Sequence, residues 1–143
     1  MTEATENLSP DLQSSLLCDD VRQELNGKFI LIGLFEGIAV PAYPAVFQRI
    51  CLVNRWCCGR GVFKQKSRII KPDGTTPMAE GKEVDIHLKD EIFTATSVEF
   101  FMNVKFDAPG TYWVEVLLDG DIRIRYPLKA GVINIQQQNT ATT

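Results

Sequence analysis

The chain has 143 residues, of which 45% are hydrophobic and 23% charged, with a formal net charge of −3. These values are typical of one ordinary globular domain and lie well away from disordered and membrane compositions. Residues 1–10 lack the apolar block of a signal peptide, and no run of about 18 apolar residues could span a membrane, so we expect a cytoplasmic protein without membrane contact.

Both ends of the chain are polar and show no apolar periodicity. They lack the hydrophobic residues that offset the entropy of ordering a chain. We therefore expect flexible tails at residues 1–13 and 136–143, with a single domain over residues 14–135.

The first hairpin is expected at Asn26-Gly27, a dipeptide that readily forms a type I′ turn between two strands. The second strand of this pair, Phe29–Phe35, is apolar at almost every position. Such a run predicts a central strand or one face of a subunit contact. Self-association through this segment, and hence a homo-oligomer, is one expectation.

A second hairpin is expected from Ala45 to Gly74, with Gly59-Arg60-Gly61 at its tip and Pro72-Asp73-Gly74 as a closing turn. Period-two alternation divides its first strand into an apolar face and a mixed face. The apolar face comprises Val46, Ile50, Leu52 and Trp56, and the mixed face Arg49, Cys51, Arg55 and Cys57.

The rest of the chain continues to alternate with period two. One strand places Val84, Ile86 and Leu88 on its apolar face, and the last hairpin turns at Asp119-Gly120. Between them, the expected apolar face comprises Val98, Phe100, Met102, Val104 and Phe106. About eight short strands separated by turn signals predict an all-β fold, an antiparallel β-sandwich of immunoglobulin-like architecture.

Two stretches of the sequence resemble known groups of proteins. The closing "FDAPGTYWVEVLLDGDIRIRYPLKA" is similar to the last strands of immunoglobulin-like and macroglobulin-type bacterial sandwich domains. "CDDVRQELNGKFILIGLFEGI" followed by "RGVFKQKSRIIKPDG" resembles small uncharacterised bacterial proteins that share a Cys-Asp-x-Val-Arg hairpin, a similarity covering Leu17 to Leu128. This resemblance implies a β-sandwich and transfers no catalytic residue.

Catalytic signals are weak in this sequence. His87 is the one histidine, and its neighbours on the expected strand face are charged, so we interpret it as exposed and non-catalytic. We expect the four cysteines, Cys18, Cys51, Cys57 and Cys58, to be free packing thiols in a reducing compartment. A thiol-dependent enzyme that uses one of them is the alternative.

No cofactor or metal site is expected from the spacing of potential ligands. Adjacent Cys57 and Cys58 point to opposite faces of a strand and cannot readily chelate one ion. Acidic pairs at Asp19-Asp20, Asp90-Glu91 and Asp119/Asp121 leave calcium-dependent binding as a further alternative.

The charge distribution is uneven. Residues 37–72 contain no Asp or Glu and carry a charge of +7, which leaves −10 on the remainder of a chain whose total is −3. Lys64, Lys66 and Arg68 share one strand face, as do Arg49 and Arg55. If those faces coincide across the second hairpin, they form a basic stripe. The stripe comprises Arg49, Arg55, Arg60, Lys64, Lys66 and Arg68.

The functional expectation is a non-catalytic interaction or assembly module. Its basic hairpin would dock a protein partner with an acidic surface. Nucleic acid is disfavoured because Trp56 and Phe63 point away from the basic side chains, so no stacking platform accompanies them. The contrasting interpretation is that these cations only solubilise an outer face, keep a strand edge from pairing, or meet the acidic half of the same chain.

Overall fold

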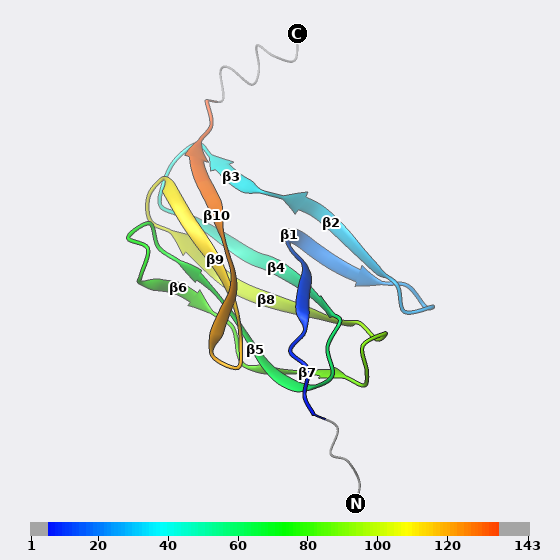
Figure 1. The fold of residues 1–143 in the computed structure, drawn as a ribbon. Coiled ribbons are helices and arrows are strands. Elements are labelled where there is room, and N and C mark those ends of the chain that lie inside the picture. The colour runs from blue at the N-terminus through cyan, green and yellow to red at the C-terminus, as the bar shows by residue number, and fades with distance from the viewer. Residues whose placement is uncertain (1–5, 135–143) are drawn as a thin grey trace, which may run out of the picture.

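The computed structural model describes residues 6–134, and within this range the chain forms ten β-strands and no helix (Figure 1). The segment expected as a C-terminal tail lies outside the described residues. The strands are β1 (Asp11–Gln23), β2 (Phe29–Phe35), β3 (Gly37–Val40), β4 (Ala45–Cys57), β5 (Gly61–Ile70), β6 (Pro77–Glu80), β7 (Val84–Leu88), β8 (Ala95–Phe106), β9 (Gly110–Leu118) and β10 (Asp121–Val132).

These strands form two sheets. One has the order β2-β1-β4-β8, and the other has the order β3-β10-β9-β5-β6, with β7 also paired to β5. Neighbours are antiparallel apart from the parallel pair of β3 and β10. The all-β fold is confirmed, with ten strands where about eight were expected, and the immunoglobulin-like assignment stays a prediction.

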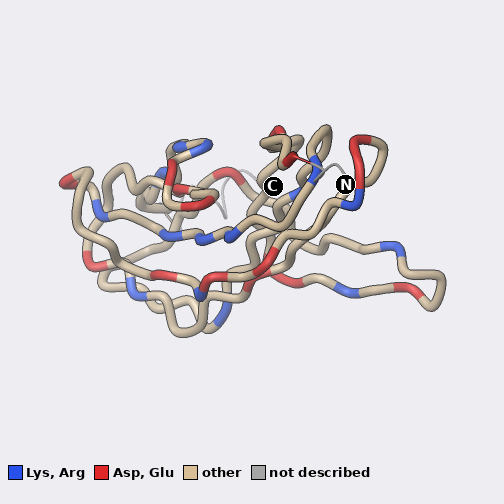
Figure 2. Tube along the Cα trace, turned by 60° about the horizontal axis from the view of Figure 1, so that its bottom comes forward, with Lys and Arg blue, Asp and Glu red and all other residues tan. Residues whose placement is uncertain are grey.

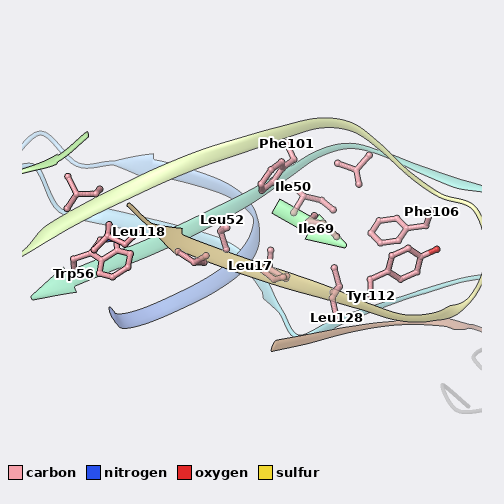
Figure 3. Packing of buried hydrophobic residues seen from close by; sticks show 14 of the residues in the cluster. Leu17, Ile50, Leu52, Trp56, Ile69, Phe101, Phe106, Tyr112, Leu118 and Leu128 are labelled. Carbon is pink, nitrogen blue, oxygen red and sulfur yellow. The ribbon is translucent and has the colours of Figure 1, made fainter. Parts of the chain in front are cut away.

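The hydrophobic core lies between the two sheets (Figure 3). Trp56 from one sheet and Tyr112, Val114 and Leu118 from the other are almost completely buried. Phe106 and Tyr112 meet edge to face with ring centroids 4.8 Å apart, a favoured aromatic geometry. This core holds the two sheets together.

The first strand begins inside the segment expected as an N-terminal tail. Leu8 pairs with Arg60 through two backbone hydrogen bonds of 2.8 and 2.9 Å, and β1 starts at Asp11 opposite Cys57. Residues 1–5 of that segment lie outside the described part of the chain.

The first expected hairpin is confirmed, although its turn differs from the type I′ expectation. Gly27 N donates to the Glu24 carbonyl at 2.9 Å, and Gly27 has a positive φ of 93° whereas Asn26 does not. This geometry fits a type I turn followed by a left-handed glycine. The last hairpin is also confirmed, and there both Asp119 and Gly120 have positive φ, as a type I′ turn requires.

The expected second hairpin is wrong, because β4 and β5 belong to different sheets. Gly59 packs so closely on Pro10 that an added Cβ would lie 2.6 Å from the proline Cβ. The chain crosses at this point from one sheet to the other. Strand β5 buries one alternating face, whereas β4 buries both faces over residues 50–54, and Val46 of its expected apolar face is exposed.

The expected apolar face of β8 is also wrong in its first half. Phe100 and Met102 are at least half exposed, while Glu99 and Phe101 point inward. Asn103 has a positive φ of 52°, and beyond it Val104 and Phe106 return to the core as expected. This irregular residue changes the face that the strand presents, which a strict period of two cannot anticipate.

Candidate functional site

The six cations of the expected basic stripe are divided between the two sheets. Arg49 and Arg55 lie on β4, whereas Lys64, Lys66 and Arg68 lie on β5. The stripe across two paired strands is therefore wrong. Figure 2 shows basic and acidic segments interleaved across the molecule.

On β5, the three cations share one face, as the alternation predicts, and each meets a carboxylate from a neighbouring strand. Lys64 Nζ lies 2.6 Å from Asp85 Oδ1, and Lys66 Nζ lies 3.4 Å from Glu80 Oε1. Arg68 Nε donates to Glu115 Oε1 at 2.6 Å. These acids come from β7, β6 and β9, so the cations are neutralised from within the chain.

Glu115 is the most buried member of these pairs. Its side chain is 3% exposed and also accepts a hydrogen bond from Arg125 Nη1 at 2.9 Å. Arg125 in turn lies over the Trp113 ring, 4.9 Å from its centroid. Two arginines thus hold one buried carboxylate, an arrangement that stabilises the sheet.

The remaining three cations are also bonded within the chain. Arg49 Nη2 donates to Asp20 Oδ1 at 2.7 Å, Arg60 Nη1 lies 2.8 Å from Glu91 Oε1, and Arg55 Nε donates to Thr96 Oγ1 at 3.1 Å. Docking of an acidic partner by these residues stays a prediction, and any such partner must compete with these internal contacts.

The four thiols are free, and two of them face each other. Cys18 on β1 lies directly opposite Cys51 on β4, and both are completely buried. They form a small second cluster with Val53, against which Val21 and Leu31 pack. Cys57 is half-buried and Cys58 is exposed.

Burial makes the thiols of Cys18 and Cys51 poor nucleophiles. It raises the pKa of Cys18 to about 11 and also raises the pKa of Cys51. The pKa of Cys57 is raised by its hydrogen bond with Cys58. Since the thiolate is the reactive form, an elevated pKa argues against the thiol-enzyme alternative at these three residues.

His87 is exposed, as predicted, on β7. Within residues 6–134, no three His, Cys, Asp or Glu side chains lie close enough together to hold a metal ion. The acidic pairs considered for calcium therefore do not converge there.

A buried polar cluster between the sheets was not anticipated from the sequence. Gln65 Oε1 accepts from Trp56 Nε1 at 2.7 Å and from Ser97 Oγ at 3.0 Å, and Gln65 Nε2 donates to Glu99 Oε1 at 3.3 Å. Glu99 Oε2 is buried without a partner among the described residues, and burial raises the pKa of Glu99. The signal in the sequence is Glu99 within "VEFF", which period-two alternation sets on the face opposite to the expected apolar face.

The second unexpected feature is the free edge of β2. Of the two alternatives predicted for Phe29–Phe35, the central strand is wrong and the subunit contact stays a prediction. Strand β2 is the outermost strand of its sheet, paired with β1 alone among the described strands (Figure 1). Between Asp20 and Gln23, β1 pairs with β2 and with no other described strand. This half of the hairpin is thus a two-stranded ribbon, which is marginally stable in water on its own.

The side chains of β2 leave a row of apolar surface beside this edge. Ile30, Ile32 and Leu34 are 42%, 44% and 57% exposed, while Leu31 packs on the thiol cluster. No charged residue or proline interrupts Phe29–Phe35. Natural sheet edges usually carry such residues as protection against pairing with another strand. The β2 edge, defined as residues 28–36, lacks them within the strand.

A pocket adjoins the end of the β2 edge. Its volume is about 380 Å³, and it lies between β1 and β10, with Phe35 and Glu36 on one side and Pro127 and Lys129 on another. Tyr126 also lines it and shares a hydrogen bond of 2.9 Å with Ser15.

Comparison with known proteins identifies one family. The model of a family of unknown function (DUF6941) matches residues 13–131, most of the chain. No curated protein matches the sequence. Among the described residues, no helix is both long and apolar enough to cross a membrane.

Proposed function

Because the chain belongs to this family of unknown function, we propose a role from its own geometry: it is a non-catalytic interaction module that binds partners by strand addition at the β2 edge. In strand addition, an extended partner segment pairs with the exposed backbone of an edge strand. Backbone hydrogen bonds give affinity, and side chains beside the edge give selectivity.

The observation that carries this proposal is the unprotected state of the β2 edge. The other sheet ends in the short strands β3 and β6, of four residues each. Strand β8 is interrupted by Asn103 and carries charged Lys105. The seven-residue strand β2 also has one positive-φ residue, Gly33, but it carries no charged residue, and a third strand would support its two-stranded outer half.

The basic side chains are weaker support for binding, because carboxylates of the same chain already bond five of the six. A thiol-dependent activity is disfavoured by the raised pKa values of Cys18, Cys51 and Cys57. The family description supplies no activity of its own.

The test compares two lysine substitutions on exposed strand positions. Ile32→Lys places a charge at the middle of the β2 edge, and Val62→Lys places one on β5, where the side chain is similarly exposed at 52% against 44%. Each variant and the wild type are immobilised, and proteins retained from a lysate of the source cell are quantified by mass spectrometry.

The proposal predicts proteins that bind the wild type and the Val62→Lys variant but are lost from the Ile32→Lys variant. As a control, circular dichroism and thermal unfolding are measured for both variants to establish that each is folded. If all three proteins retain the same partners, or if none retains any, binding of lysate proteins at the β2 edge is refuted.

A further inference from the structure

We propose that the strand added to the β2 edge comes from a second copy of this chain, in a two-fold antiparallel pair centred on Ile32. This inference rests on the proposed function and names its partner. In such a pair, each residue of β2 lies opposite the residue equally distant from Ile32 in the other copy. Ile32 therefore meets Ile32, and Ile30 meets Leu34.

Charge complementarity selects this register. Lys28 immediately precedes β2 and Glu36 immediately follows it, and each lies four residues from Ile32. Pairing centred on Ile32 places Lys28 of each copy opposite Glu36 of the other, which gives two opposite-charge contacts per dimer. Shifting the register by one or two residues either way places at least one of these charges against an apolar residue or glycine.

Both charges are free to make this contact. Lys28 and Glu36 are exposed, and neither side chain has an ion-pair or hydrogen-bond partner among residues 6–134. The cations on β5, in contrast, are paired within the chain. The charges that flank the unprotected strand are thus available to a partner.

The apolar side chains are arranged to match. Period-two alternation places Ile30 and Ile32 on the side of β2 opposite to Leu31, and these residues are exposed. In the proposed pair, the row Ile30, Ile32 and Leu34 lies beside the same row running the other way. Directly opposed apolar side chains in neighbouring antiparallel strands contact each other and stabilise the pairing.

Gly33, the irregular position of β2, is compatible with this arrangement. Its φ is +70°, and it lies opposite Asp19 of β1, between the pairs Cys18–Leu34 and Asp20–Ile32. In the dimer it lies opposite Leu31 of the other copy, where the missing side chain leaves room. One seven-residue edge offers less area than a standard interface, so we expect a weak, concentration-dependent dimer.

The test is a charge exchange followed by sedimentation velocity of the purified full chain, from low micromolar to millimolar concentration. In the Lys28→Glu variant, a carboxylate at residue 28 faces the Glu36 carboxylate of the other copy at both contacts. In the Glu36→Lys variant, two ammonium groups face each other at both contacts. We expect each single variant to dimerise roughly tenfold more weakly than the wild type, because like charges opposed across strands are destabilising. The double variant restores opposite charges and should dimerise like the wild type.

The most selective arm mixes the two single variants in equal amounts. A copy with Lys28→Glu then meets a copy with Glu36→Lys, and both contacts become attractive. We expect the mixture to dimerise about as well as the wild type although each component alone does so weakly. Lys28 and Glu36 are both exposed, so the variants should fold normally.

Outcomes that overturn the inference differ from those that overturn the proposed function. A wild type that is monomeric at every concentration excludes a second copy as the partner. The Ile32 register is excluded if the single variants dimerise like the wild type. It is also excluded if the mixture dimerises no more strongly than each single variant alone. In each case the comparison of Ile32→Lys with Val62→Lys against lysate proteins still decides whether the edge binds other strands.

Discussion

Asp19 and Gly33 lie opposite each other in the β1–β2 hairpin, so close that a Cβ on Gly33 would overlap the Asp19 carboxylate. Gly33 also has a φ of +70°, a conformation that residues with side chains rarely adopt. The hairpin that presents the β2 edge therefore depends on a glycine at this position.

Substitution of Gly33 by alanine should destabilise the hairpin. We expect the free energy of unfolding to fall by about 1–3 kcal/mol, because the strained backbone conformation adds to the overlap with Asp19. Chemical denaturation measures the change. Gly27→Ala is the matched control, since Gly27 also has positive φ but no atom lies within 4 Å of its added Cβ. An equal decrease in the free energy of unfolding of both variants would contradict the overlap between the added Cβ and Asp19 as a cause.

Glu99 should make stability depend on pH. Burial raises its pKa in the folded protein above its ordinary value of 4.5, so the folded state binds more protons than the unfolded state between these two values. The protonated Glu99 carboxyl contributes favourably to the free energy of unfolding below pH 4.5, and this contribution is lost as the pH rises through the pKa of the folded state. The Glu99→Gln variant has no carboxyl group at this position, so it does not lose stability in this way as the pH rises.

The melting temperature of Glu99→Gln, relative to wild type, should therefore increase as pH rises from 4.5 toward neutrality. Thermal unfolding of both proteins across this range measures the difference, in which contributions from other groups cancel. A difference that is constant with pH would show that the pKa of Glu99 is not raised by its surroundings.

Glu115 should contribute more to stability than the exposed carboxylates. Glu115→Gln leaves Arg68 and Arg125 beside a neutral amide, and we expect a loss of about 2 kcal/mol in the free energy of unfolding. Urea denaturation measures it. Glu83→Gln, at an exposed position, should change stability little. A small effect at both positions would mean that the two arginines are solvated well enough without Glu115.

The thiols should differ in their reactivity. Cys58 is exposed and should react first with an aromatic disulfide reagent at neutral pH, whereas Cys18 and Cys51 should react when the protein unfolds. The time course of thiol modification, with Cys58→Ser as the comparison, gives this order. Fast reaction of two further thiols in the folded Cys58→Ser protein would contradict the buried positions of Cys18 and Cys51.

Local features of this fold could be predicted from sequence because they depend on neighbouring residues. The turn at Asp119-Gly120 and the common face of Lys64, Lys66 and Arg68 follow from backbone preferences and period-two alternation. Both are confirmed. The exposed position of His87 follows from the same alternation.

Features that depend on distant segments could not be predicted. The sheet to which β5 belongs is decided by its pairing with β9 and β7, which lie far along the chain. The carboxylates that neutralise Lys64 and Arg68 lie on those two strands. Likewise, the apolar run Phe29–Phe35 suits a central strand or an exposed contact equally well, and alternation alone does not distinguish them.

The central claim is that the β2 edge pairs with another strand, and amide hydrogen exchange across a concentration series measures this most directly. We predict that backbone amides of Phe29–Phe35 directed away from β1 exchange fast in dilute solution and slow down at high protein concentration, whereas amides of the edge strand β6 do not change. Exchange in β2 that is the same at every concentration would contradict pairing of the β2 edge with a second copy.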